Sequence, residues 1–257
     1  MLILTYHSLD NTGSVISLAP ETFARQMRFL KANGYRVVTL HDLCESWKTG
    51  AGLSSRTIAL TFDDGYANLM ETALPVLEEC GFRATIFVVA GYVGAHNNWA
   101  SQPSTVPLLR LLGWRDLREL SHTGFEIAGH TWTHPALAGI SKEALAREIG
   151  GSKDLIEQRI GTPVRSFAYP YGVVDAAARD SVASHYLAAC TTQMGEVSAE
   201  DDRYTLKRID SYYLRPTVLF RSLDTVFGRS YLNMRDFGRR FRARLRKWNR
   251  PDLTEAR

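Results

Sequence analysis

Short apolar runs alternate with segments of helical periodicity along most of the chain. Several runs are apolar at nearly every position, as strands of a parallel sheet are when both faces are covered. Between the runs, apolar residues recur at spacings of three and four, as Phe23, Met27 and Leu30 do. The pattern predicts strands at 2–6, 36–40, 57–62, 84–89, 126–129, 166–169, 187–191 and 206–210. It predicts helices between Pro20 and Gly34 and at 68–80, 114–121, 141–160 and 175–184.

Strand–helix alternation of this kind is typical of parallel βαβ units and predicts an α/β fold. The pattern alone fits an open doubly wound sheet and a closed barrel equally well. In both architectures, functional side chains collect at the carboxyl ends of the strands. The polar residues that follow the predicted strands are therefore the first candidates for a functional site.

Polar side chains do follow several of these strands. His7 follows the first, Asp63 and Asp64 follow the third, and His130 and His134 follow the fifth. The sixth strand runs into a Tyr-Pro-Tyr-Gly segment. An Asp-Asp-Gly sequence by itself is usually a turn, and a single histidine is usually a surface or core residue. Because both motifs lie at strand ends, their common placement favours one shared site.

The histidine and aspartate motifs are suited to a divalent metal ion. A spacing of four residues would put His130 and His134 on one side of a helical turn, where both rings reach one ion. Two imidazoles and one carboxylate leave coordination positions open for water, as in catalytic rather than structural sites. An ion on Asp64 would relieve its repulsion with Asp63 and leave Asp63 free as a base. The sequence therefore predicts a metal-dependent hydrolase.

Three motifs together resemble those of a known family. Residues 61–65 (Thr-Phe-Asp-Asp-Gly), 130–135 (His-Thr-x-x-His-Pro) and 169–172 (Tyr-Pro-Tyr-Gly) are similar to the first three motifs of the polysaccharide deacetylases. This is the NodB-homology group, carbohydrate esterase family 4, and the order and spacing also match over about residues 1–215. The resemblance implies a distorted (β/α) barrel of about seven or eight parallel strands. It also implies removal of N-acetyl groups from amino sugars, as in exopolysaccharide biosynthesis.

The resemblance further implies a role for each residue of the site. Asp63 would be the general base, and Asp64, His130 and His134 would bind one divalent ion, usually zinc, with cobalt or nickel as alternatives. The backbone amide of Tyr171 would join the metal in holding the oxyanion. A cation and an N–H group already in place stabilise the negative charge that amide hydrolysis develops on the carbonyl oxygen.

Two departures from the family pattern concern proton transfer. The family usually has an arginine just before the proline of the third motif, where it orients the base, but this chain has Tyr169. Arg165 or Arg208 could replace that arginine. The late Leu-x-His motif, which usually supplies the acid, is also absent. A subgroup resembling the poly-N-acetylglucosamine deacetylases begins, like this chain, with a strand and Tyr-His, so His7 is the predicted acid. The alternative is that His7 only packs or hydrogen-bonds at the strand end.

Further residues are candidates for contact with the substrate. Aromatic rings suit sugar-binding surfaces, and Trp132, between the two histidines, could form the floor of the site or only pack. Asp210 ends the last predicted strand and could tune the site or pair with Arg208. The candidate substrate contacts are Tyr66, Trp132, Tyr169, Pro170, Arg208 and Asp210.

The last part of the chain differs in charge from the rest. Residues 235–250 hold eight Arg or Lys and one Asp, which leaves 23 basic and 26 acidic residues elsewhere. A basic amphipathic helix of this kind either packs on the catalytic domain or lies on an anionic membrane surface, here through residues 234–248. No nucleic-acid partner is expected. We divide the chain into a catalytic barrel, 1–228, and a basic helix and tail, 229–257. The apolar residues at helical spacing are Met234, Phe237, Phe241, Leu245 and Trp248.

The sequence also bears on location and on alternative functions. It begins without a basic segment and long apolar run, and no stretch reaches the roughly 18 apolar residues of a membrane span. Cys44, Cys80 and Cys190 are too few and too scattered for a disulfide framework. These features predict a cytoplasmic protein, peripheral on the inner membrane face if the basic helix binds lipid, whose partner is an N-acetylated glycan or lipid-linked saccharide. The alternatives are a hydrolase of a small non-sugar amide or imide and a glycan-binding pseudoenzyme.

Overall fold

A parallel sheet forms the centre of the molecule. The computed structural model describes residues 1–50 and 56–248, and side chains as far as residue 238. Among these residues, eight strands pair in parallel in the order β10-β1-β5-β6-β7-β8-β9, with β4 also on β5. The strands are β1 (Leu2–Tyr6), β4 (Arg36–Val38), β5 (Thr57–Phe62), β6 (Thr85–Val88), β7 (Glu126–Gly129), β8 (Ser166–Ala168), β9 (Ala188–Cys190) and β10 (Ile209–Asp210).

The predicted α/β barrel of seven or eight parallel strands is confirmed. All eight predicted strands are present, and β1, β5 and β7 have the predicted bounds. The first half of β5 pairs with β4 and its last two residues pair with β6, while β1 runs along its other edge. Because two strands share one edge of β5, the barrel is distorted. β9 and β10 are the two ends of the sheet.

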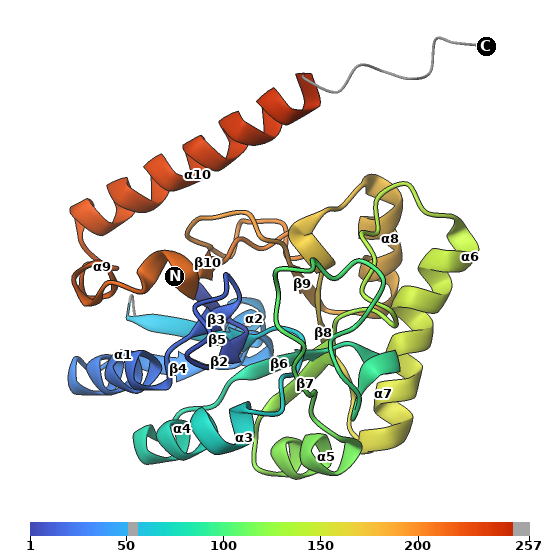
Figure 1. Ribbon diagram of the computed structural model, residues 1–257, viewed down its shortest axis with the longest axis horizontal. Helices are drawn as coiled ribbons and strands as arrows, with labels where there is room; N and C mark the ends of the chain where they lie inside the picture. The colour runs from blue at the N-terminus through green and yellow to red at the C-terminus, as the bar shows by residue number, and fades with distance from the viewer. Residues whose placement is uncertain (51–55, 249–257) are drawn as a thin grey trace.

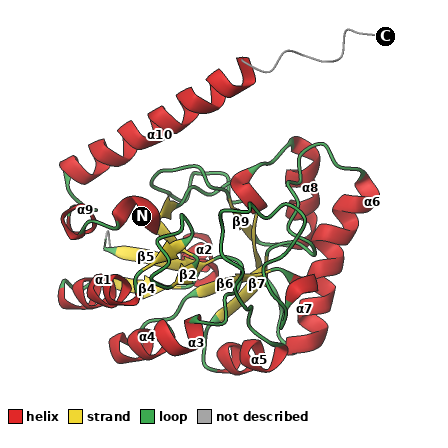
Figure 2. Cartoon of the chain, viewed as in Figure 1, coloured by secondary structure: helices red, strands yellow, loops and turns green. Residues whose placement is uncertain are grey.

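Helices surround the sheet on its outer side (Figures 1 and 2). Two short strands, β2 (Ser8–Leu9) and β3 (Ser17–Leu18), pair separately. The helices are α1 (Pro20–Ala32), α2 (Leu40–Thr49), α3 (Leu69–Thr72), α4 (Leu74–Cys80), α5 (Trp114–His122), α6 (Lys142–Leu145), α7 (Ser152–Ile160), α8 (Ala176–His185), α9 (Thr217–Arg221) and α10 (Val226–Trp248).

One predicted strand and two predicted helices differ from the structure. The predicted strand 36–40 ends early, because Thr39 caps α2 by accepting a hydrogen bond from the Asp42 amide at 3.1 Å. The predicted helix 68–80 is interrupted between α3 and α4, since Pro75 at the start of α4 has no amide N–H to donate. The predicted helix 141–160 contains a π-helical segment, Ala146–Gly151, between α6 and α7.

A buried cluster along the strands combines small and large side chains. Ala59, Ala128, Ala168 and Cys190 form one buried cluster with Phe87. Their neighbours along the strands belong to a larger cluster shared with the surrounding helices. The Phe87 ring centre lies 6.4 Å from that of His130 and 5.5 Å from the guanidinium carbon of Arg208, so Phe87 packs beside the strand ends.

The first half of the C-terminal helix packs on the barrel, since Leu232 belongs to the core cluster and the Tyr231 hydroxyl donates to the Tyr213 carbonyl at 3.3 Å. α10 begins at Val226 and extends beyond α9 (Figure 1). The predicted tail at 249–257 and the side chains of 239–248 lie outside what the structure describes. Within the described ranges, no helix is long and apolar enough to cross a membrane. Cys44, Cys80 and Cys190 are free thiols.

Candidate active site

One cavity lies at the carboxyl ends of β1, β5, β7 and β10. Its volume is about 390 Å³. Nine of the predicted site residues line it: His7, Asp63, Asp64, Tyr66, His130, His134, Tyr171, Arg208 and Asp210. Thr5, Val15, Ile16, Gln102, Pro103, Val106, Thr192 and Tyr213 complete the wall. The strand-end rule therefore located His7, Asp63, Asp64, His130 and His134 of this cavity from the sequence.

Asp64, His130 and His134 form a buried group whose ligand atoms lie within 4.8 Å of one another. The Nε2 atoms of the two histidines are 3.3 Å apart, and Asp64 Oδ1 lies 3.5 and 3.3 Å from them. Asp64 Oδ1 is buried without a hydrogen-bond partner among the described residues. Two imidazoles and a carboxylate are a donor set for a catalytic divalent ion. An ion at this point would satisfy the buried oxygen and both nitrogens, so these residues fit a metal.

The two histidines do not lie on a helical turn, and that prediction is wrong. His130 follows β7 directly, and the segment to His134 is a loop. Thr131 and His134 have φ values of 68° and 61°, in the left-handed region that side chains rarely adopt. These two residues fold the loop back, and the Thr131 hydroxyl accepts a hydrogen bond from the His134 amide at 2.9 Å. The four-residue spacing thus brings the rings together through a strained loop.

Each histidine has a hydrogen-bond partner on the nitrogen that faces away from Asp64. His130 Nδ1 lies 2.7 Å from the Ala168 carbonyl oxygen, which can only accept, so Nδ1 donates and Nε2 keeps its lone pair. His134 Nδ1 lies 3.1 Å from the Tyr171 hydroxyl, which in turn donates to Ser101. Burial, and then the charge of His134, lower the pKa of His130 to about 4. Its ring is therefore neutral near pH 7, as a metal ligand must be.

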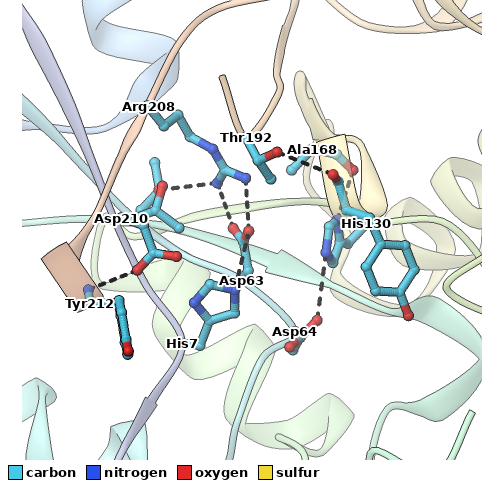
Figure 3. A network of polar contacts seen from close by, with 12 residues as sticks. His7, Asp63, Asp64, His130, Ala168, Thr192, Arg208, Asp210 and Tyr212 are labelled. Atoms are coloured by element: carbon cyan, nitrogen blue, oxygen red, sulfur yellow. Dashed lines mark hydrogen bonds and ion pairs between the residues drawn. The ribbon is translucent and has the colours of Figure 1, made fainter. Parts of the chain in front are cut away.

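Asp63 is held by Arg208 in a buried two-point ion pair. Arg208 Nη1 donates to Asp63 Oδ1 at 2.6 Å, and Nη2 donates to Oδ2 at 2.8 Å (Figure 3). Arg208 also donates from Nε to the Thr191 carbonyl at 3.0 Å, and its guanidinium carbon lies 5.5 Å from the centre of the Phe87 ring. Burial, the largest single influence, raises the pKa of Asp63, but the charges of Arg208, His130 and His7 and the hydrogen bonds from Arg208 together hold that pKa below its usual value. Asp63 is thus a fixed carboxylate.

His7 faces the opposite edge of Asp63 from the end of β1 (Figure 3). Its Nε2 lies 3.9 Å from Asp63 Oδ2, and its side chain is 20% exposed. This distance is longer than a hydrogen bond, so the ring remains free to engage a molecule in the cavity. The two predictions for His7, that it acts as the acid and that it only packs or hydrogen-bonds at the strand end, both stay predictions.

The remaining predicted residues occupy different environments. Arg165 is exposed and Tyr169 is fully buried. Trp132, Tyr169 and Pro170 are not among the described residues that line the cavity. The Trp132 ring packs closely against Gly91, where any added Cβ would come within 2.7 Å of it, and beneath Arg147. In the structure, Trp132 therefore acts as a packing residue.

Some residues of the site were not predicted from the sequence. The segment between β6 and α5 supplies Ser101, Gln102, Pro103 and Val106. It shows neither helical nor strand periodicity, so no pattern indicates where its side chains lie. Glu148 also contacts the loop of the two histidines. Its position within a long predicted helix gave no sign of this contact.

A family model described as "Polysaccharide deacetylase" matches residues 51–189 of this chain. YxkH of Bacillus subtilis (strain 168), provisionally named a polysaccharide deacetylase, is 26% identical over 208 residues, which are 80% of this chain and 70% of YxkH. The poly-beta-1,6-N-acetyl-D-glucosamine N-deacetylase of Staphylococcus epidermidis is 24% identical over 203 residues, which are 75% of this chain and 67% of that protein.

A solved structure agrees with these sequence matches. BC0361, a polysaccharide deacetylase from Bacillus cereus, superimposes with a TM-score of 0.66 at 27% identity. The match covers 81% of this chain and 64% of that chain. This chain therefore spans about two thirds of the length of these three proteins.

Proposed function

Because the chain belongs to the polysaccharide deacetylase family, we propose that it is a metal-dependent hydrolase of the N-acetyl amide on an amino sugar. One observation carries this proposal. The buried group of Asp64, His130 and His134 shares a cavity with a second aspartate, Asp63, which Arg208 holds in place. A glycan-binding pseudoenzyme would need neither the metal ligands nor an oriented base.

The ion would be held by Asp64, His130 and His134, and we propose zinc, with cobalt and nickel as alternatives. The nitrogen and carboxylate donors of these three residues suit zinc, cobalt and nickel alike. When bound, such an ion would lower the pKa of a water molecule and polarise the acetyl carbonyl.

Asp63 would take the proton from the attacking water. Both of its oxygens are held by Arg208, so the carboxylate plane is fixed before the substrate arrives. The backbone N–H of Tyr171 would donate to the oxygen that becomes negatively charged. Tyr171 lies beside the metal ligands, since its ring centre is 4.9 Å from that of His134.

His7 would protonate the sugar nitrogen as the carbon–nitrogen bond breaks. An amine leaves only after protonation, so the reaction needs an acid as well as a base. Among the described residues that line the cavity, His7 is the one histidine outside the group of metal ligands. Acetate and the free amino sugar would then leave.

The cavity suits one N-acetylated sugar unit of a polysaccharide, oligosaccharide or lipid-linked saccharide. About 390 Å³ lies within the range of roughly 300–1,000 Å³ that is usual for small-molecule sites. Val15 and Tyr171 line it and are 61% and 42% exposed, which offers an apolar rim to neighbouring sugars. The name of the S. epidermidis relative makes β-1,6-linked N-acetylglucosamine the first polymer to test. A small non-sugar amide or imide would make no use of that rim.

Docking of α10 on an anionic membrane is a second part of the proposal. Val226, Phe227, Met234 and Phe237 are each more than 60% exposed. A helix of 3.6 residues per turn places these four within one third of its circumference. With the basic residues of 235–250, this stripe would suit the headgroup region and would bring the cavity near lipid-linked saccharides. Co-sedimentation with phosphatidylglycerol vesicles tests it, and absence of binding at low salt would contradict it.

The proposed activity is tested by measuring acetate release from a panel of substrates. The panel contains β-1,6- and β-1,4-linked N-acetylglucosamine oligomers and lipid-linked N-acetyl sugars. Simple cyclic imides, whose hydrolysis opens the ring and releases no acetate, are assayed separately by ring opening. We expect wild-type protein loaded with zinc to release acetate from at least one glycan, and Asp63→Asn to release almost none. Turnover of the imides alone would favour the small-amide alternative. Zinc-loaded protein that is inactive on every substrate would favour the pseudoenzyme.

A further inference from the structure

We infer that Glu148 is a positioning residue that holds the metal-binding conformation of the histidine loop, residues 130–134, an inference that rests on the metal site proposed above. Glu148 Oε2 accepts hydrogen bonds from the amides of Trp132 and Thr133, both at 2.8 Å. Its other oxygen accepts the Thr133 hydroxyl at 2.7 Å. One buried carboxylate thus binds three donors between the two ligand histidines.

The histidine loop needs such an acceptor. It leaves the sheet after β7, so the amides of Trp132 and Thr133 have no strand or helix to supply a carbonyl. Buried amides without acceptors are unfavourable, and the left-handed residues Thr131 and His134 already make this conformation a costly one. Without Glu148, an open conformation in which these amides bind water would have the lower free energy. Opening would separate His130 from His134.

The π-helical segment Ala146–Gly151 presents Glu148 to the loop. A π turn leaves carbonyl groups without their normal helical donors, and π turns are frequent at functional sites. Here the Ser152 hydroxyl donates to the carbonyls of Glu148 and Ile149 at 2.7 and 2.9 Å. The Tyr186 hydroxyl donates to the Ile149 carbonyl at 3.1 Å. These hydroxyls supply the donors that the π turn lacks, and they therefore stabilise it as part of the fold.

Close packing leaves the π segment little room to move. Gly151 faces the Trp132 ring, whose atoms would lie 3.6 Å from an added Cβ. Gly150 faces His185 on α8, where an added Cβ would come within 2.7 Å of the ring. The segment is thus enclosed between the histidine loop and α8. Because both sides are packed, Glu148 can hold the loop without shifting itself.

The test compares three variants by metal affinity. Glu148→Ala removes all three acceptor contacts. Glu148→Gln keeps them, because its carbonyl can accept both amides while its NH₂ donates to the Thr133 hydroxyl. Glu157→Ala is the matched control, since Glu157 lies on the following helix α7 and accepts the Val164 amide at 2.8 Å, away from the histidine loop.

Zinc affinity is measured by competition with a chromogenic chelator, and the cobalt-loaded proteins are compared by visible absorption. We expect Glu148→Ala to bind zinc about 10- to 100-fold more weakly, as is usual when a residue that supports metal ligands is lost. Its cobalt spectrum should also change. Glu148→Gln and Glu157→Ala should stay close to wild type in both measurements. Glu148→Asp, whose shorter side chain cannot reach all three donors, replaces the alanine variant if that variant does not fold.

The outcomes separate this inference from the proposed function. Wild-type protein that binds neither zinc nor cobalt would overturn both. Wild-type binding together with unchanged affinity and spectrum in a folded Glu148→Ala would overturn only the role of Glu148. Equal weakening in Glu148→Ala and Glu157→Ala would show a general loss of stability and would also overturn it.

Discussion

The residues proposed to bind metal (the metal-binding half) and those proposed to transfer protons (the proton-transfer half) are brought together in different ways. Asp64, His130 and His134 belong to two short motifs that follow β5 and β7. The proton-transfer half joins Asp63 to Arg208, 145 positions later, and to His7 at the end of β1. The metal-binding half therefore depends on local sequence. The proton-transfer half depends on the pairing of β1 with β10, the first and last strands along the chain. We therefore expect a substitution in the proton-transfer half to leave metal binding intact.

The largest effect is expected when the metal-binding half is removed. Asp64→Ala takes away the carboxylate between the two imidazoles, so bound metal and turnover should be lost together. Metal content is measured by mass spectrometry after gel filtration, and acetate release is measured on the same samples. Chelation of the wild-type protein should have the same result, and added zinc should reverse it. Turnover by metal-free protein would show that hydrolysis does not need the metal-binding half and would contradict this prediction.

His7→Ala should impair the proton-transfer half alone. We expect turnover of an N-acetyl sugar to fall by about 10²- to 10⁴-fold, the usual contribution of a general acid, with metal content unchanged. Hydrolysis of an aryl acetate should fall much less, because a phenolate leaves without prior protonation. Equal losses on amide and ester would mean that His7 binds the substrate rather than protonating it.

Arg208→Met tests the buried ion pair that joins Arg208, just before β10, to Asp63, just after β5. It leaves the buried Asp63 carboxylate without its partner, and breaking such a pair usually costs about 3–5 kcal/mol in the free energy of unfolding. Arg28→Met is the matched control, since Arg28 also holds a carboxylate, that of Glu79, through two contacts, from Nε and Nη2, at the surface, where water screens them. Urea unfolding should show a large loss for Arg208→Met and little change for Arg28→Met. Similar losses in both would remove the distinction between buried and exposed pairs.

Tyr171→Phe is expected to have the smallest effect and concerns a residue that serves both halves. The change keeps the backbone amide but removes the hydroxyl that contacts His134 Nδ1. Zinc affinity should fall by about 10-fold, the lower end of the usual effect of such partners, while turnover at saturating zinc stays near wild type. Chelator competition and steady-state kinetics measure the two quantities. Unchanged affinity would show that Ser101 or water can replace the hydroxyl.

Much of the fold was predictable because apolar runs report buried strands directly. β5 is buried at every position and was predicted to the residue. α2 was missed because its first residue, Leu40, continues the apolar run of β4, and only the cap by Thr39 marks the change. Propensity does not reveal such a boundary when strand and helix adjoin without a loop.

The candidate site was predictable where chemistry is concentrated in short motifs. The aspartates and histidines were found from their placement at strand ends, but the shape of the histidine loop was not, since two left-handed residues have no sequence signal when neither is glycine. Arg208 was one of two candidates to replace the missing arginine. The choice between Arg208 and Arg165 required the three-dimensional pairing of β10 with β1.

The position of Arg208 on the chain has a consequence for modularity. The segment that matches the family model, 51–189, holds Asp63 and all three proposed metal ligands but includes neither His7 nor Arg208. A fragment trimmed to that segment, or a chimera that exchanges it alone, would transplant the metal ligands and leave behind both partners of the base. The proposed catalytic residues therefore extend beyond the segment that matches the family model, and we expect a working graft to need β1 and β10 as well.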